Sequence, residues 1–353
     1  MDKKNEIQRI WTECFSDTPQ WIEMYFDRVY RDDCAMTLSV DNQTVSSLLL
    51  LRYDFLFQGR IVPAAYVAGA ATRRQARGRG YMGELMREAL RASRDRGDML
   101  CSLIPAHDWL YFYYDRFGFT TVFYVDMQRF TSLHKFTGNG DHYHEVDDHF
   151  APEIQEAMER MERLRGCGII HTRRDFLNIM DDLRLERDAR FVAIASDMGE
   201  ICSMAWAVRR GEVVEVRELL SVDEEAAKAA LRALRSCYPD APFRIMAPAT
   251  GNHRHLYSRG MARIVNAGLC LECIAAEHTG WKYAIRVYDR LLGENSHTYI
   301  IGGGRVRIDD SYCGHLDFDV TVEVLNAMVF SDKKTGEILG FPSERAHMAL
   351  MLD

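Results

Sequence analysis

VAGAATRRQARGRGYMGELMREAL, residues 67–90, joins an apolar strand to an amphipathic helix. The joint has the spacing Gln75-x-x-Gly78-x-Gly80, with two arginines directly before it and two within it. Consecutive backbone N–H groups in such a turn point into one concavity, and the start of the helix adds about half a positive charge. Because the glycines permit positive φ and close approach of a ligand, the stretch predicts a pyrophosphate site. An ordinary tight strand-to-helix turn is the alternative.

The residues around this stretch predict an α+β fold with an internal duplication. Two helices are expected before residue 30, and an antiparallel meander over 34–71 then leads into the loop. From about Ala151 the order helix, strand, strand, strand, helix, strand comes again, although the residues barely repeat. Short alternating strands follow residue 280, and 342–352 are expected to be helical or mixed. We predict three domains, at residues 1–140, 141–278 and 279–353.

The composition excludes several classes of protein. The chain has 353 residues, 47% apolar and 27% charged, so it can bury a sizeable core and is not disordered throughout. Its formal net charge of −8 argues against general nucleic-acid binding, which needs a basic surface. No segment reaches the roughly 18 consecutive apolar residues of a membrane span. We therefore expect neither a nucleic-acid partner nor a span.

The cysteines and the start of the chain predict a cellular compartment. Nine cysteines, an odd number spread along the chain, fit free thiols in a reducing compartment better than a disulfide framework. Cys270 and Cys273 stand alone in an apolar run and are expected to be core residues, with redox or metal chemistry as the alternative. The charged first residues lack the apolar centre of a signal peptide. We expect a cytoplasmic protein without a bound metal.

The loop at 67–90 resembles motif A of the GNAT acyltransferases, which carries the signature Gln/Arg-x-x-Gly-x-Gly/Ala. Downstream, YFYYDRFGF at 111–119 resembles the segment Tyr-x-[Arg/Lys]-[Phe/Leu]-Gly-Phe that ends the cofactor site in that family. The whole chain is similar to the Eis (enhanced intracellular survival) type of acetyltransferase. This resemblance implies a GNAT domain, a second, degenerate GNAT-like domain and a C-terminal sterol-carrier-protein-like α/β domain. It also implies an oligomer, since Eis-type proteins form hexamers.

The resemblance implies transfer of an acetyl group from acetyl-CoA to an amine. The backbone at 68–70 is expected to pair with the pantetheine arm as an added strand would. The loop at 75–81 is expected to take the pyrophosphate. The predicted cofactor-binding residues are Ala68, Gly69, Ala70, Gln75, Ala76, Arg77, Gly78, Arg79, Gly80 and Tyr81. In the second unit the corresponding loop, SVDEE at 221–225, is acidic and would repel a pyrophosphate.

Two proton-handling groups are expected at the reaction centre. Tyr114 matches the tyrosine acid of the family, and its hydroxyl is a suitable donor to a departing thiolate. Tyr113 is adjacent, and core packing is the alternative role for either ring. Eis-type enzymes use their own C-terminal carboxylate as the base, and the chain ends in the apolar tail MALMLD. We therefore nominate the α-carboxylate of Asp353, with the side-chain carboxylate of the same residue as a second candidate; a tail merely docked on the core is the alternative.

The acceptor is not determined by the sequence. By analogy with similar folds, a pocket is expected beside the first two helices, with an aromatic wall and carboxylates that attract a cation. The candidate residues are Trp11, Phe15, Trp21, Glu23, Phe26 and Asp27. Such a pocket suits a polyamine, an aminoglycoside-like amine or a lysine side chain. The competing interpretation of the chain is a non-catalytic acyl-CoA sensor or a lipid-binding module.

Overall fold

The computed structural model describes residues 2–138, 142–249 and 256–352, and the chain forms two compact units. The first unit comprises Met1–Phe123 and Arg259–Ala346, and the second comprises Tyr124–Ser258 and His347–Asp353. The second unit is therefore inserted into the sequence of the first. The boundary predicted at 140/141 falls outside the described residues, and the division into three domains stays a prediction.

The first unit begins with two short helices, α1 (Lys3–Cys14) and α2 (Pro19–Arg28). The side chain of Asp2 caps α1 and that of Thr18 caps α2, where Pro19 takes the first helical position. The faces that carry Ile10 and Ile22 are buried. This matches the expectation of two amphipathic helices before residue 30.

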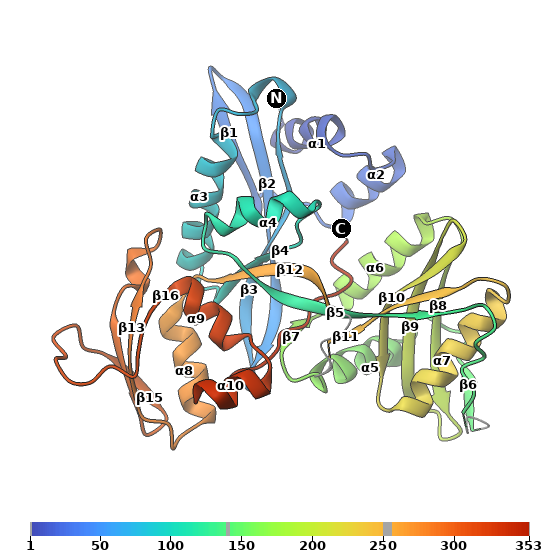
Figure 1. Ribbon diagram of the computed structural model, residues 1–353. Coiled ribbons are helices and arrows are strands. Elements are labelled where there is room, and N and C mark those ends of the chain that lie inside the picture. Colours follow the sequence, from blue (N-terminus) through green and yellow to red (C-terminus); the bar gives the residue numbers. More distant parts are fainter. Residues whose placement is uncertain (1, 139–141, 250–255, 353) are drawn as a thin grey trace. The chain divides into compact units, whose positions relative to one another are not determined.

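The sheet of the first unit begins with three antiparallel strands, β1 (Ala35–Val40), β2 (Gln43–Phe57) and β3 (Arg60–Thr72). A single turn, η1 (Arg74–Ala76), leads into α3 (Tyr81–Asp95), which returns the chain to β4 (Leu100–Leu103), parallel to β3. The last residues of β12 (Leu256–Ile264) pair antiparallel with β4. Figure 1 shows α3 on one side of β2 and α1 with α2 on the other. The chain continues through α4 (Asp108–Asp115) into β5 (Thr120–Phe130).

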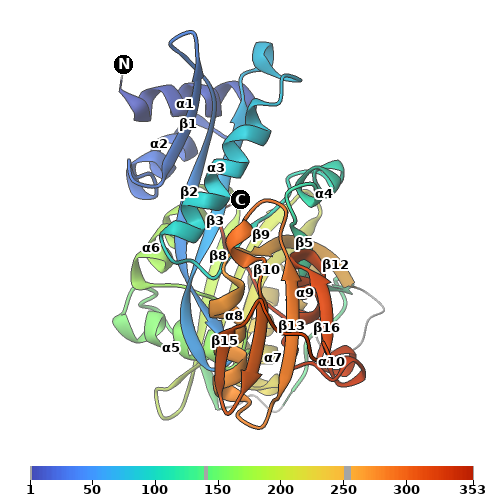
Figure 2. The same ribbon diagram turned by 90° about the vertical axis from the view of Figure 1, so that its left-hand side faces the viewer.

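The residues after β12 complete the first unit. They form a four-stranded sheet in the order β15-β14-β13-β16, accompanied by three helices (Figure 2). The elements are α8 (Ala267–Glu277), β13 (Tyr283–Tyr288), η3 (Gly293–Asn295), β14 (Thr298–Gly302), β15 (Arg305–Ile308), β16 (Phe318–Thr321), α9 (Val322–Val329) and α10 (Lys333–Leu339). The glycines at 303 and 304 have positive φ and turn β14 into β15.

The second unit repeats the order of elements seen around α3. Strands β8, β9 and β10 are antiparallel, and α7 then leads to β11, which is parallel to β10. The elements are β6 (Tyr143–Glu145), α5 (Pro152–Arg163), β7 (Gly168–Ile170), α6 (Arg173–Leu185), β8 (Ala189–Ser196), β9 (Ile201–Arg210), β10 (Val213–Ser221), α7 (Glu224–Cys237) and β11 (Phe243–Pro248). The predicted duplication is therefore present at the level of topology.

The helix start in the second unit differs from that of α3. Asp223 caps α7 by accepting from the N–H of Ala226, and the first turn carries Glu224 and Glu225. Carboxylates already occupy the positive end of this helix, and their charge opposes an anion. This supports the expectation that the second unit does not bind acyl-CoA.

The end of the chain corrects one expectation. Residues 342–352 contain no helix; they run as irregular chain with a single bridge between Gly168 and His347. Leu350 and Leu352 have positive φ and pack against the core of the second unit. The apolar side chains of this segment are buried although the chain is irregular, and their apolar character alone led to the expectation of a helix. None of the helices within the described residues is long and apolar enough to cross a membrane.

Buried and half-buried ionisable groups lie close to the bridge between Gly168 and His347. His347 accepts from Ile169 N–H at 3.0 Å and donates to Cys167 O at 3.1 Å through its backbone. Arg165 pairs with Glu218 at 2.7 Å. Burial, reinforced by Arg165, lowers the pKa of His347 to about 3. The imidazole is therefore neutral in the folded protein.

Acidification is expected to destabilise the second unit through His347. Its folded pKa lies below the ordinary value of about 6.5, so its stabilising effect is full above that pH and falls as the pH drops. Between pH 6.5 and 5 we expect a loss of about 2 kcal/mol relative to His347→Gln, measured by urea unfolding. His171 is present in both proteins, so its contribution cancels when the change in unfolding free energy of His347→Gln is subtracted from that of the wild type. Equal pH dependence of the two proteins would contradict this expectation.

Candidate active site

The turn before α3 has the geometry of an anion site. Gly78 and Gly80 have φ of 76° and 86°, and Gly80 is the residue that precedes the helix. A Cβ built at either glycine meets nothing within 4 Å, so the backbone conformation, and not crowding, requires glycine there. The first N–H groups of α3 have no partner within the helix and are available to a ligand.

The side chains of the loop divide into two groups. Arg73 is bound to Glu13 at 3.2 Å and to Thr44 O at 2.8 Å, so it serves the fold and its charge is neutralised. Glu13 also accepts from the N–H of Arg74 at 2.6 Å. The remaining cofactor candidates on the loop are exposed or half-buried, apart from the buried Ala76: Gln75, Arg77, Arg79 and Tyr81. The site thus keeps the cations of Arg74, Arg77 and Arg79 at the surface.

The strand before the loop carries a bulge at the predicted pantetheine position. Leu49 pairs with Ala68 and Ser47 pairs with Ala71, so Gly69 and Ala70 together face one residue of β2. Pairing with β4 ends at Tyr66. Among the described strands β3 neighbours only β2 and β4, so 68–70 lie beyond the last β4 pair. An extended ligand could add to this free edge.

Trp11 lies directly against the bulge. A Cβ added to Gly69, whose φ is 58°, would lie 2.0 Å from Cζ3 of Trp11. The indole is 6% exposed and its N–H donates to Asp17 at 2.7 Å. Glycine is required at position 69 because the ring occupies the space of a side chain.

Tyr114 lies in the core on the other side of the strands. It is 8% exposed, and it belongs to the buried cluster that also contains Leu48 and Val67. Burial, and then the neighbouring Tyr113, raise the pKa of its hydroxyl well above the usual range. Tyr113 is half-buried, with its ring centre 5.3 Å from that of Tyr114. Tyr114 therefore keeps its proton at neutral and mildly alkaline pH.

The structure brings together only some of the acceptor-pocket candidates. Ring centres lie 4.9 Å apart for Trp11 and Phe15, and 5.9 Å apart for Trp11 and Trp21. Phe26 is fully buried and stacks on Tyr30. Glu23 is exposed, and Asp27 is exposed and paired with Lys4 at 3.0 Å. The other nominated catalytic residue, Asp353, lies outside the described residues.

Sequence reasoning missed Glu13 as a residue that holds the turn at 75–81, the predicted phosphate turn. Its two oxygens bind the Arg73 guanidinium and the Arg74 N–H. The contact spans about 60 residues, and no local pattern distinguishes this carboxylate from the others of α1.

The backbone of the turn provides one testable prediction. Gly80→Ala forces a side chain into left-handed φ at a cost of about 1–2 kcal/mol, and relaxation would turn the N–H groups away. We expect the KM for acetyl-CoA to rise about tenfold, measured by thiol release. Gly199→Ala is the matched control, because φ is 79° there and the space is equally open. An unchanged KM in Gly80→Ala would contradict an anion site in this turn.

The family model of the acetyltransferase (GNAT) domain matches residues 2–122 of the chain. This part of the chain is a GNAT acetyltransferase domain. The match covers the turn, the bulged strand and Tyr114, the features that the resemblance had singled out. The assignment makes the chain an acyltransferase, and acetyl-CoA is the co-substrate that this family uses.

Solved structures share the fold over nearly the whole chain. A probable N-acyltransferase from Enterococcus faecalis V583 is 16% identical with a TM-score of 0.79, covering 95% of this chain and 90% of that one. Eis1 from Mycobacterium abscessus is 14% identical with a TM-score of 0.70, covering 96% and 90%. A GCN5-related N-acetyltransferase from Kribbella flavida is 15% identical with a TM-score of 0.71, covering 97% and 91%. At these identities the likeness shows the GNAT and Eis-like fold alone.

No curated protein matches the sequence. Within the described ranges, no group of three or more His, Cys, Asp or Glu side chains is placed to hold a metal ion. The nine cysteines are all free thiols.

Proposed function

We propose that the chain is an acetyl-CoA-dependent N-acetyltransferase that transfers the acetyl group directly to a primary amine. One observation carries the proposal: a single unit combines an anion-accepting turn, the free edge of a bulged strand and a buried tyrosine that keeps its proton. These are the parts that binding of a pyrophosphate, alignment of a thioester arm and protonation of a thiolate require.

In the proposed reaction the N–H groups after Gly78 bind the pyrophosphate, and 68–70 align the pantetheine arm. The protonated amine loses one proton to the Asp353 carboxylate and forms a C–N bond to the acetyl carbon, after which the nitrogen loses a second proton to solvent. The C–S bond then breaks, and Tyr114 donates its proton to the departing sulfur. The raised pKa of Tyr114 keeps the hydroxyl protonated over the whole working range of pH, as a general acid requires, and it also makes the hydroxyl a weaker proton donor.

The acceptor is proposed to be a cationic small-molecule amine or a lysine side chain bound near α1 and α2. The aromatic rings of Trp11, Phe15 and Trp21 support an apolar wall there, and exposed Glu23 supports attraction of a cation. Asp27 is less suited, because Lys4 already neutralises it.

The remaining expectations stay proposals. The third segment, 279–353, is proposed to have a sterol-carrier-protein-like fold. The chain is proposed to form an oligomer, with the hexamer as the form that the resemblance implies. The free thiols support a reducing compartment, and we place the protein in the cytoplasm.

A thiol-release assay with acetyl-CoA tests the proposed function. The amine panel spans polyamines, aminoglycosides and lysine peptides, and the wild type is compared with a chain truncated after Leu350. Turnover that is lost on truncation supports the enzyme and the terminal base. Turnover that survives truncation removes Asp353 from the mechanism. Tight binding of acetyl-CoA without turnover, measured by calorimetry, favours the acyl-CoA sensor instead.

A further inference from the structure

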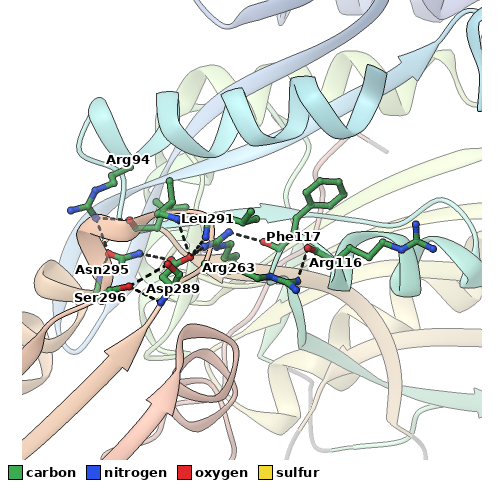
Figure 3. Close-up of polar contacts among 12 residues, drawn as sticks. Arg94, Arg116, Phe117, Arg263, Asp289, Leu291, Asn295 and Ser296 are labelled. Carbon is green, nitrogen blue, oxygen red and sulfur yellow. Dashed lines mark hydrogen bonds and ion pairs between the residues drawn. The ribbon is translucent and has the colours of Figure 1, made fainter. Parts of the chain in front are cut away.

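A buried polar network joins β12 to the end of α4 (Figure 3). Arg263 is only 1% exposed, and its guanidinium pairs with Asp289 at 2.5 Å. The same guanidinium donates to Phe117 O at 2.7 Å. Phe117 follows Tyr114 by three residues, and its N–H donates to Tyr114 O at 2.9 Å. Arg263 therefore binds the turn that ends the helix of the proposed acid.

Asp289 is held by several further donors. One of its oxygens accepts from the N–H groups of Leu291 and Leu292, each at 3.0 Å, and the other accepts from the Asn295 side chain at 2.9 Å. Its side chain is completely buried. These bonds fix the carboxylate, and the carboxylate in turn fixes the direction of Arg263.

Carbonyl groups at the end of α4 accept hydrogen bonds from residues outside the helix. The last carbonyls of a helix have no partner within it and attract cations. Arg290 donates to Arg116 O at 2.7 Å, and Arg263 takes the next carbonyl, that of Phe117. The helix has only eight residues and makes few bonds of its own. The two arginines therefore determine where its last turn lies, and Tyr114 is in that turn.

Residues 289–296 also bind the C-terminal end of α3, the helix that follows the predicted phosphate turn. Arg94, in the last turn of α3, donates to the Asn295 side chain at 2.8 Å and to Glu294 O at 3.1 Å. Asn295 is the residue that donates to Asp289. Residues 289–296 thus connect the helix that begins at the phosphate turn with the helix that carries the acid (Figure 3).

We propose that Arg263 and Asp289 are positioning residues for Tyr114, and that 289–296 set the hydroxyl of the acid relative to the acyl-CoA site. This rests on the proposed function. Neither residue is proposed to touch substrate; both act through the Phe117 carbonyl. Because a displacement of about 1 Å at a reacting group can cost about 100-fold in rate, loss of this restraint lowers kcat more than it weakens binding.

The test compares Asp289→Asn with Tyr114→Phe and with the double variant. Asp289→Asn removes the charge that orients Arg263 while keeping size, and we expect kcat to fall about 100-fold with the KM for acetyl-CoA within about twofold. In the Tyr114→Phe background the same change is expected to have almost no further effect, because the positioned hydroxyl is already absent. Asp332→Asn, which breaks the partly buried Arg345 pair in the same unit, is the matched control.

An equal loss of kcat from Asp289→Asn in both backgrounds would overturn the proposal and leave a purely structural ion pair. If Asp289→Asn fails to fold, Arg290→Gln carries the test, because Arg290 is exposed and donates to the end of α4 at Arg116 O. It is expected to lower kcat several-fold only when Tyr114 is present. A Tyr114→Phe protein with wild-type kcat would instead refute the acid role in the proposed function, which keeps the two failures distinguishable.

Discussion

Tyr114→Phe is expected to lower kcat by about 10²- to 10⁴-fold while the KM for acetyl-CoA stays nearly unchanged. The substitution removes one oxygen atom and keeps the ring in the buried cluster with Leu48 and Val67. The departing thiolate then loses its proton donor, but the phosphate turn and the bulged strand are untouched. Steady-state kinetics with saturating amine give both constants, and thermal unfolding verifies that the fold is intact.

Tyr113→Phe is the matched control, since it removes the same atom from the adjacent, less buried ring. It is expected to retain most of the activity. The pH profile provides a second measurement. A general acid must be protonated, and because burial raises the pKa of Tyr114, its activity should not decline up to about pH 10. Equal losses in the two variants would contradict the assignment of Tyr114 as the acid.

Gly69→Ala is expected to destabilise the first unit by about 3 kcal/mol and to weaken acetyl-CoA binding. Two costs add: a side chain at positive φ, about 1–2 kcal/mol, and overpacking against the Trp11 ring, about 1–3 kcal/mol. The ring or the strand must move, because the new Cβ would lie 2.0 Å from the indole. Urea unfolding and the KM for acetyl-CoA measure the two consequences.

Gly97→Ala separates the two costs. Its φ is 83° and an added Cβ meets nothing within 4 Å, so it bears the backbone cost alone. The Gly69→Ala/Trp11→Ala double variant should recover part of the loss relative to the sum of the single changes, since the clash is then absent. If Gly69→Ala unfolds at the same urea concentration as Gly97→Ala, the clash with the Trp11 ring does not contribute to the loss of stability.

The local parts of the site were predictable from sequence because their signals are local. The loop at 75–81 combines glycines, arginines and a helix start within a few residues, and the segment around Tyr114 has its own spacing. The turn, its positive φ values and the topological duplication all follow those patterns. The domain match then confirms the family of residues 2–122.

The restraints on the site could not be predicted in the same way. Glu13 meets Arg73 across 60 residues, and Arg263 meets Phe117 across 146. Each is one charged residue among many, and only the fold selects its partner. The expectation of helical structure over 342–352 was wrong for a related reason. Leu350 and Leu352 pack against the core of the second unit from an irregular segment, and burial of apolar side chains alone does not distinguish such a segment from a helix.

The interruption of the first unit by the second has a consequence for synthesis on the ribosome. Residues 124–258, 135 in all, are made between the two parts of the first unit. At about 5–20 residues per second, roughly 7 to 30 seconds pass before Arg263 and β12 can join β4 and the end of α4. The phosphate turn and Tyr114 are translated early, but the contacts that hold them arrive late. A nascent chain should therefore acquire acetyl transfer only near completion, after the inserted unit has emerged.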